Sequence, residues 1–234
     1  MTPDSSFVRV VLLRGKEKAL LEGHPWLFSG AIAQVEGPED SPLAVVYGAD
    51  GRALGFGFYS ARSQIRVRLL GPASGFGTTV DRTLFGERLD AAIALRRAVL
   101  PSETTGYRLL NAEGDGIPGW TVDVFGGALV SQITVAGLEI LRDEAYAALA
   151  ERFPRAPFVQ INDVPARRAE GLPRENEVIA GEPPPEVEFL ESGLRFTADL
   201  AAGQKTGFYC DQRENRRRAE RYAGGRRVLD LFAH

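Results

Sequence analysis

The chain has 234 residues, 44% of them hydrophobic and 25% charged, which is ordinary for a globular protein and enough for a substantial core. Its only cysteine, Cys210, excludes an internal disulfide, and the presence of only two histidines, His24 and His234, argues against a metal site. No apolar run approaches the roughly 20 residues of a membrane-spanning helix, and residues 1–11 lack a signal-peptide pattern. We therefore expect a cytoplasmic, metal-free protein of one or two domains.

The net charge of −3 argues mildly against nucleic-acid binding, but the charges are unevenly distributed. Residues 175–199 are acidic, whereas residues 213–227 are rich in arginine. Local patches rather than the total charge decide which ligands a surface attracts.

Residues 1–72 have the pattern of a small β-barrel. Short apolar strands are expected over residues 7–13, 26–35, 43–48, 53–59 and 64–70, with a short helix over 16–22. Glycine and proline mark the turns, as at Gly37-Pro38 and Asp50-Gly51. Many short strands separated by such turns are typical of barrels.

After a linker over residues 72–79, the pattern becomes mixed α and β. We expect helices over 81–99, 138–152 and 211–222, and strands over 107–112, 121–125, 129–134, 158–162, 187–190 and 195–199. A last apolar strand is expected over 227–232, two residues before the chain ends at His234. With Asp230 near its end, this strand is similar to the first strand of a doubly wound nucleotide-binding fold.

The strand over 64–70 is the first candidate binding surface. Alternation along an extended chain puts Arg62, Arg66 and Arg68 on one face. Three guanidinium groups in a row suit phosphate oxygens, which predicts RNA binding. The alternative is a solvated face paired with nearby carboxylates.

Two turns carry polar residues that favour a structural interpretation. His24-Pro25-Trp26 is expected to be a packing corner with Trp26 buried, since no partner for a catalytic histidine is nearby. Residues 111–120 lack the spacing of a calcium loop and predict a tight structured loop. Glu113 and Asp115 remain functional candidates because structured loops often carry function.

Residues 203–216 are the richest segment, since they place several kinds of polar group and aromatic rings before a helix. Such a loop offers backbone N–H groups to an anion and a ring for stacking. The spacing of a phosphate loop is absent, because Gln204 precedes Lys205. The plainer alternative is a helix cap, with Asp211 in the first turn.

Cys210 is a candidate nucleophile, because methylation at C5 of a pyrimidine requires a thiolate to add at C6. Lys205 and Arg213 are close enough in sequence to lower its pKa. The alternative is an inert cysteine that packs at the start of a helix.

These motifs resemble the class I methyltransferase family that makes 5-methylcytosine in large-subunit ribosomal RNA and carries an N-terminal PUA domain. The matching stretches are residues 24–32, 57–68, 113–119 and above all 203–209 with 211–213. The resemblance covers nearly the whole chain. Cys210 departs from it, because an aliphatic residue is usual there, which disfavours Cys210 as the nucleophile.

The resemblance implies a PUA-like RNA-binding domain over 1–72, a central α+β domain over 80–200 and the start of a Rossmann-like methyltransferase domain over 201–234. It implies S-adenosylmethionine (SAM) as cofactor and large-subunit rRNA as partner. The implied cofactor-binding residues are Gln204, Lys205, Thr206, Gly207, Phe208, Tyr209, Asp211, Arg213 and Asp230. In the family the glycine-rich cofactor turn and the catalytic cysteines follow this point, so the nucleophilic cysteine is expected beyond His234.

We therefore expect an N-terminal portion of a longer enzyme, truncated at His234 before its nucleophile, that binds RNA without catalysing methylation. The alternative is a non-catalytic PUA-type RNA-binding protein. A PUA domain attached to another RNA-modifying enzyme has no support from a second domain. The sequence leaves the oligomeric state open, with a homodimer as one option.

Overall fold

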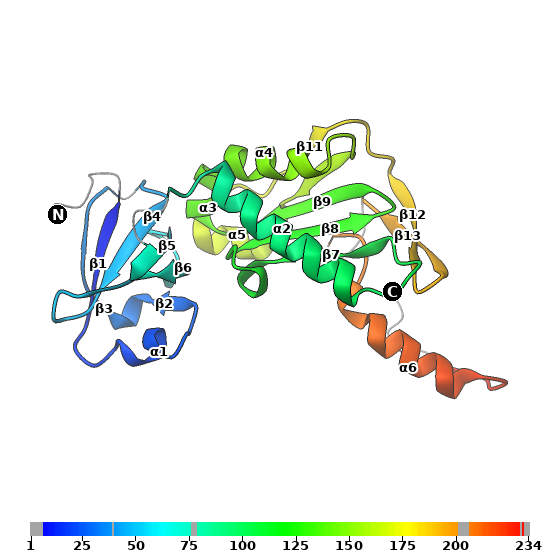
Figure 1. The fold of residues 1–234 in the computed structure, drawn as a ribbon, viewed down its shortest axis with the longest axis horizontal. Helices are drawn as coiled ribbons and strands as arrows, with labels where there is room; N and C mark the ends of the chain where they lie inside the picture. Colours follow the sequence, from blue (N-terminus) through cyan, green and yellow to red (C-terminus); the bar gives the residue numbers. More distant parts are fainter. Residues whose placement is uncertain (1–6, 39, 76–78, 201–205, 230, 232–234) are drawn as a thin grey trace.

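The computed structural model describes residues 7–38, 40–75, 79–200, 206–229 and 231 (Figure 1). A smaller N-terminal unit lies at one end of the molecule, and a larger unit of sheet and helices adjoins it. No helix in the described part of the chain is long and apolar enough to cross a membrane.

The N-terminal unit is a six-stranded sheet in the order β2-β6-β5-β4-β1-β3. Its two edge strands follow each other in the chain and are separated only by the short 3-10 turn η1 (Ser29–Ala31), so the sheet curls toward a barrel. Valines that alternate along its strands, such as Val8, Val10 and Val67, are fully buried inside. The elements are β1 (Val8–Leu12), α1 (Lys18–Leu21), β2 (Trp26–Phe28), β3 (Ile32–Glu36), β4 (Leu43–Tyr47), β5 (Ala53–Tyr59), β6 (Ile65–Pro72) and the 3-10 turn η2 (Ala73–Gly75).

The larger unit is built on a five-stranded sheet in the order β11-β10-β9-β8-β7. One face packs against α2 and α4 through a core that includes Phe85, Trp120 and Leu149, all fully buried. The strands are β7 (Gly106–Asn111), β8 (Trp120–Phe125), β9 (Ala128–Ile133), β10 (Phe158–Ile161) and β11 (Asn176–Ala180). The helices are α2 (Arg82–Val99), α3 (Ala136–Ile140), α4 (Arg142–Arg152) and α5 (Pro165–Glu170), with a 3-10 turn η3 (Ala112–Asp115).

The other face of this sheet is partly covered by a hairpin of β12 (Glu186–Glu191) and β13 (Leu194–Asp199). Phe125 on β8 and Phe189 on β12 lie 5.1 Å apart between ring centres, in a second core that also holds Val130 and Ala198. After the hairpin come the 3-10 turn η4 (Cys210–Gln212) and α6 (Arg213–Ala223). Helix α6 buries none of its residues and projects from the body (Figure 1).

The structure confirms the mixed α and β character but corrects several element predictions. The strand expected over 26–35 is two strands, since η1 turns the chain so that β2 pairs with β6 and β3 with β1. The helix expected over 138–152 is divided at Leu141. Helix α5 and strand β11 were not predicted, because α5 is short and half charged and β11 is short and mostly exposed.

The predicted strand over 227–232 is wrong over residues 227–229. Residues 227–229 have no regular structure, and Val228 and Leu229 are 69% and 81% exposed. A strand exists through pairing with a neighbour, and within the described ranges no strand lies beside these residues. Asp230 and His234 lie outside the described residues.

Candidate functional site

The predicted cofactor segment is described from Thr206 onward, and Gln204, Lys205 and Asp230 lie outside the described residues. The hydroxyl of Thr206, which is buried, donates a hydrogen bond to the carboxylate of Asp123 on β8. Asp123 is itself fully buried and accepts two hydrogen bonds of 2.9 Å from the guanidinium of Arg108. This pairing raises the pKa of Arg108. Thr206 therefore anchors the segment to the sheet through the buried carboxylate of Asp123.

Gly207 turns the chain where no other residue fits without strain. Its φ is +113°, and an added Cβ would lie 2.9 Å from the carbonyl oxygen of Asp199. A substitution would have to overcome both the conformation and the contact.

Phe208 packs into the second core rather than standing free. Its ring centre lies 4.9 Å from that of Phe189 and 5.1 Å from that of Phe196. The guanidinium of Arg216 lies 4.4 Å from the centre of the Phe208 ring and donates to the Tyr209 carbonyl at 3.0 Å. Phe208 thus fixes the direction in which the chain enters η4.

Glu191 completes this anchor from the hairpin side. The carboxylate is buried and accepts hydrogen bonds of 2.7 and 2.6 Å from Arg216, a bidentate geometry that strengthens the pair. Residues 206–216 are therefore tied to the sheet at Asp123 and to the hairpin at Glu191.

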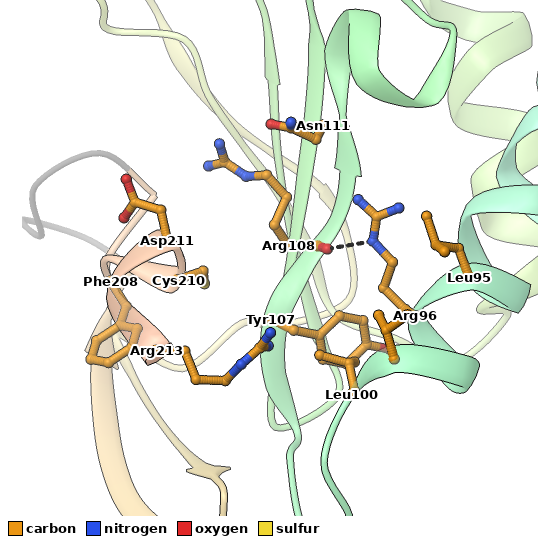
Figure 2. Close-up of a pocket in the computed structure, with 11 residues that line it drawn as sticks. Leu95, Arg96, Leu100, Tyr107, Arg108, Asn111, Phe208, Cys210, Asp211 and Arg213 are labelled. Atoms are coloured by element: carbon orange, nitrogen blue, oxygen red, sulfur yellow. Dashed lines mark hydrogen bonds between the residues drawn. The ribbon is translucent and has the colours of Figure 1, made fainter. Parts of the chain in front are cut away.

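A cavity of about 470 Å³ opens between this segment, β7 and the second half of α2. Figure 2 shows Asp211 and Arg213 on one side of it and Tyr107 and Arg108 on the other. Leu95, Val99 and Leu100 of the α2 side add apolar surface. The cavity suits a ligand with a flat apolar part and charged groups.

Cys210 also lines this cavity, but its chemistry is not that of a nucleophile. Burial raises the pKa of the thiol to about 12, with the charge of Asp123 adding to the effect. A thiol with this pKa is almost entirely protonated at neutral pH, and the thiolate is the reactive form. The pKa of Cys210 is thus raised and not lowered as expected, which supports the inert alternative, and Lys205 lies outside the described residues.

The predicted arginine face is only partly present. Strand β6 begins at Ile65, so Arg62 lies in the preceding bend and does not share the strand face. Arg66 donates to the carbonyl of Ser60 at 3.3 Å. Arg68 pairs with Glu170 at 3.3 Å and Glu113 at 3.6 Å. The prediction of three guanidinium groups in a row on one strand face is therefore wrong. For Arg68 the alternative holds, since its guanidinium is paired with carboxylates.

The two polar turns lie where they were expected, with one correction. His24 accepts a hydrogen bond from the Trp26 backbone at 3.1 Å, as in a packing corner. Trp26 is 38% exposed rather than buried, and its indole N–H donates to Glu113 at 2.7 Å. Asp115 takes hydrogen bonds of 2.5 and 2.7 Å from Arg96, which confirms a structured loop.

The sequence interpretation missed the partners of these residues. Arg108 pairs with Asp123 on the neighbouring strand. Arg216 pairs with Glu191, 25 residues away, and Arg68 with Glu170, 102 residues away. Asp123 carried a usable signal, because it is a lone charge within the apolar strand of residues 120–125. A charge at such a position is rarely buried unless it is paired.

Two protein-family models match separate parts of the chain. Residues 10–72 match a family model described as a PUA-like domain. Residues 169–234 match a family model described as S-adenosylmethionine-dependent methyltransferase. The chain is similar to ribosomal RNA large subunit methyltransferases I. That of Aeromonas salmonicida is 41% identical over 230 residues, covering 97% of this chain and 58% of the relative.

The ribosomal RNA large subunit methyltransferase I of Photobacterium profundum is 40% identical over 229 residues, covering 96% of this chain and 57% of the relative. The chain thus spans a little over half the length of these relatives. A Streptococcus mutans protein assigned to the SAM-dependent methyltransferases has a TM-score of 0.74 at 22% identity, covering 90% of this chain and 53% of that one. A second structure, a methyltransferase complexed with SAH, has a TM-score of 0.73 at 23% identity, covering 89% of this chain and 52% of that one. At this level of identity the structures show a shared fold.

The match to the methyltransferase family model runs to the C-terminal residue, His234. His234 and the two residues before it lie outside the described part of the chain, so the structure does not test what they form. Truncation at His234, and a nucleophilic cysteine beyond it, are not shown by these comparisons and stay predictions.

Proposed function

We propose that this chain is part of an enzyme that transfers a methyl group from SAM to large-subunit ribosomal RNA. The observation that carries the proposal is the segment of residues 206–213, which is anchored at Asp123 and lines the cavity beside β7. This segment lies within the stretch that matches the SAM-dependent methyltransferase model. Similarity to rRNA methyltransferases over 97% of the chain supports the same substrate.

The residues present fit the chemistry of the cofactor. Leu95, Leu100 and Tyr107 offer apolar surface to an adenine ring. The carboxylate of Asp211 offers a negative charge to the ammonium or sulfonium group. Phe208, Asp211 and Arg213 from the predicted set line the cavity, whereas Thr206 and Gly207 hold the segment in place. When bound, SAM supplies an electrophilic methyl group.

The proposed product is 5-methylcytosine. That chemistry requires a thiolate that adds to C6 of the base before C5 becomes nucleophilic. Cys210 is the only cysteine of these 234 residues, and burial raises its pKa to about 12. We therefore assign the attacking thiolate to a cysteine beyond His234. To the 234 residues themselves we assign RNA binding and one wall of the cofactor pocket.

RNA binding is proposed for the N-terminal unit, on the match to a PUA-like domain and the exposure of Arg62. The other two predicted residues have protein partners: Arg66 binds the carbonyl of Ser60, and Arg68 binds Glu113 and Glu170. The second candidate, a PUA-type RNA-binding protein without catalysis, is favoured by the absence of a reactive thiol in this chain.

Labelled SAM separates the two candidates. The full open reading frame that contains these residues is incubated with large-subunit rRNA and tritiated SAM, in parallel with the 234-residue chain. We expect label in the RNA with the full reading frame and none with the shorter chain. Stable RNA binding without label in either sample would favour the non-catalytic candidate.

A further inference from the structure

A second cavity, of about 510 Å³, lies at the junction of the two units, between the start of β6 and α5. Its size is within the range of small-ligand sites, about 300–1,000 Å³. The N-terminal unit and the larger unit contribute one wall each. The lining residues used below are Phe28, Arg62, Gln64, Arg68, Ala166 and Ala169.

The two walls are held in a fixed relation by charged contacts. Glu170 is buried and accepts from Arg68 at 3.3 Å and from the backbone of Ala136 at 3.2 Å. Glu113 binds both Arg68, at 3.6 Å, and the indole of Trp26, at 2.7 Å. A cavity formed by such contacts exists before a ligand arrives, which reduces the entropy lost on binding.

Phe28 gives this cavity an aromatic surface. Alternation along β2 turns Leu27 inward and leaves Phe28 46% exposed. On the other side Ala166 and Ala169 are exposed and small, so they leave room for a flat ring. An exposed aromatic ring in a site of this size is suited to stacking.

Arg62 and Gln64 bring polar groups to the rim. Both side chains are exposed, and neither has an ion pair or side-chain hydrogen bond within the described ranges. The stem of Arg62 lies across Gly171, where an added Cβ would be 2.6 Å from Arg62 Cδ. The guanidinium is thereby directed to the junction, whereas the guanidinium of Arg68 is already neutralised by two carboxylates.

We propose that the junction cavity binds one unstacked nucleotide of a single-stranded RNA segment. The base stacks on Phe28, the Arg62 guanidinium binds a neighbouring phosphate, and the Gln64 amide contacts the edge of the base. The inference rests on the proposed RNA binding and adds the form of RNA and the residues that select it. A duplex is disfavoured, because its bases are stacked inside and cannot reach Phe28.

The test measures affinity of the full chain for a short single-stranded RNA of mixed sequence, by fluorescence anisotropy over a range of salt. Phe28→Leu removes the ring and keeps the apolar character. We expect about tenfold weaker binding, the size of one lost base–aromatic stack, with an unchanged salt slope. Arg62→Ala should reduce the slope of log K against log salt by about 0.7, the value for one phosphate contact on a single strand. Phe28→Tyr should bind like the unaltered chain.

Tyr222→Leu is the matched control, since it removes an equally accessible ring, 76% exposed, on the remote helix α6. It should leave affinity unchanged, and circular dichroism should show all variants folded. Stacking is read directly with 2-aminopurine in the RNA, whose fluorescence Phe28 should quench and Phe28→Leu should not.

If the unaltered chain binds no RNA, the proposed function fails. If it binds RNA and Phe28→Leu binds equally well, with the same quenching, only the junction site is overturned. Equal affinity for the annealed duplex would also overturn it.

Discussion

The arginines of residues 62–68 lie at the junction of the two units, whereas those of residues 213–227 lie on and beyond a helix that projects from one unit (Figure 1). Each segment has an arginine locked to a buried carboxylate: Arg68 to Glu170 and Arg216 to Glu191. Each also has arginines without an ion pair in the part of the chain that the structure describes, Arg62 in the first and Arg218 in the second. The same residue type thus fixes the fold at one position and stays available to ligands a few residues away.

The two kinds of arginine differ in whether a buried carboxylate faces the guanidinium. Removing one partner of a buried pair leaves an uncompensated charge, which costs far more than an exposed pair contributes. A high local content of arginine therefore indicates a candidate binding region. The buried carboxylates determine which arginines in that region have a structural role.

The largest effect is expected at the anchor of the second segment. Glu191→Ala removes the buried partner of Arg216 and should lower the free energy of unfolding by about 3 kcal/mol, measured by urea denaturation. The matched control is Glu188→Ala on the same strand, whose side chain is 70% exposed and should change stability by less than about 0.5 kcal/mol. Equal effects of the two changes would contradict the assigned anchor.

The anchor of the first segment should have a smaller effect. Glu170→Ala leaves Arg68 with Glu113, so the expected loss is about 2 kcal/mol. Arg68→Lys should lose about half as much, because one ammonium cannot serve both carboxylates as the guanidinium does. A double-mutant cycle should give a coupling of Arg68 with Glu170, and additive losses would show that the junction is not held by this pair.

The arginines without ion pairs should matter little for stability. Arg62→Ala and Arg218→Ala should each change the free energy of unfolding by less than about 0.5 kcal/mol, by the same urea measurement. Arg216→Ala serves as the contrasting variant from the second segment. A loss at Arg218 comparable to that at Arg216 would remove the distinction between locked and available arginines.

The smallest effect on stability at neutral pH is expected from titration of the Cys210 thiol. Its folded pKa of about 12 lies above the ordinary thiol value of 9.0, so folding favours the protonated thiol. The resulting stability is fully present below pH 9 and is lost as the pH rises toward 12. Alkylation of the folded protein should stay slow at about pH 8 and become fast on unfolding in urea. Rapid alkylation of the folded chain at that pH would restore Cys210 as a nucleophile candidate.

Local periodicity predicted much of the fold. The strand over 53–59 matches β5, and the helix over 81–99 matches α2, whose first turn is capped by Asp81 through hydrogen bonds to Thr83 and Leu84. The strand over 227–232 failed because strand formation depends on pairing, which a sequence window does not contain. The strand over 26–35 failed at η1, where three residues turn the chain between two pairings.

The site was predicted less completely, for the same reason. Residues 206–213 were identified from their composition, and part of that segment lines the cavity beside β7. The contacts that position it join Thr206 to Asp123 and Arg216 to Glu191, which are far apart in the chain. Whether Arg68 is free depended on Glu170, 102 residues away. No local pattern carries that information.

Placement of the cofactor against residues 206–213 is tested most directly by ultraviolet cross-linking of tritiated SAM to the full open reading frame that contains this chain. Trypsin cleaves after Lys205 and Arg213 and releases residues 206–213 as one peptide. We predict label in this peptide, and its loss when excess unlabelled SAH is added. Label confined to peptides of residues 7–72, or label that SAH does not displace, would contradict a cofactor pocket at this segment.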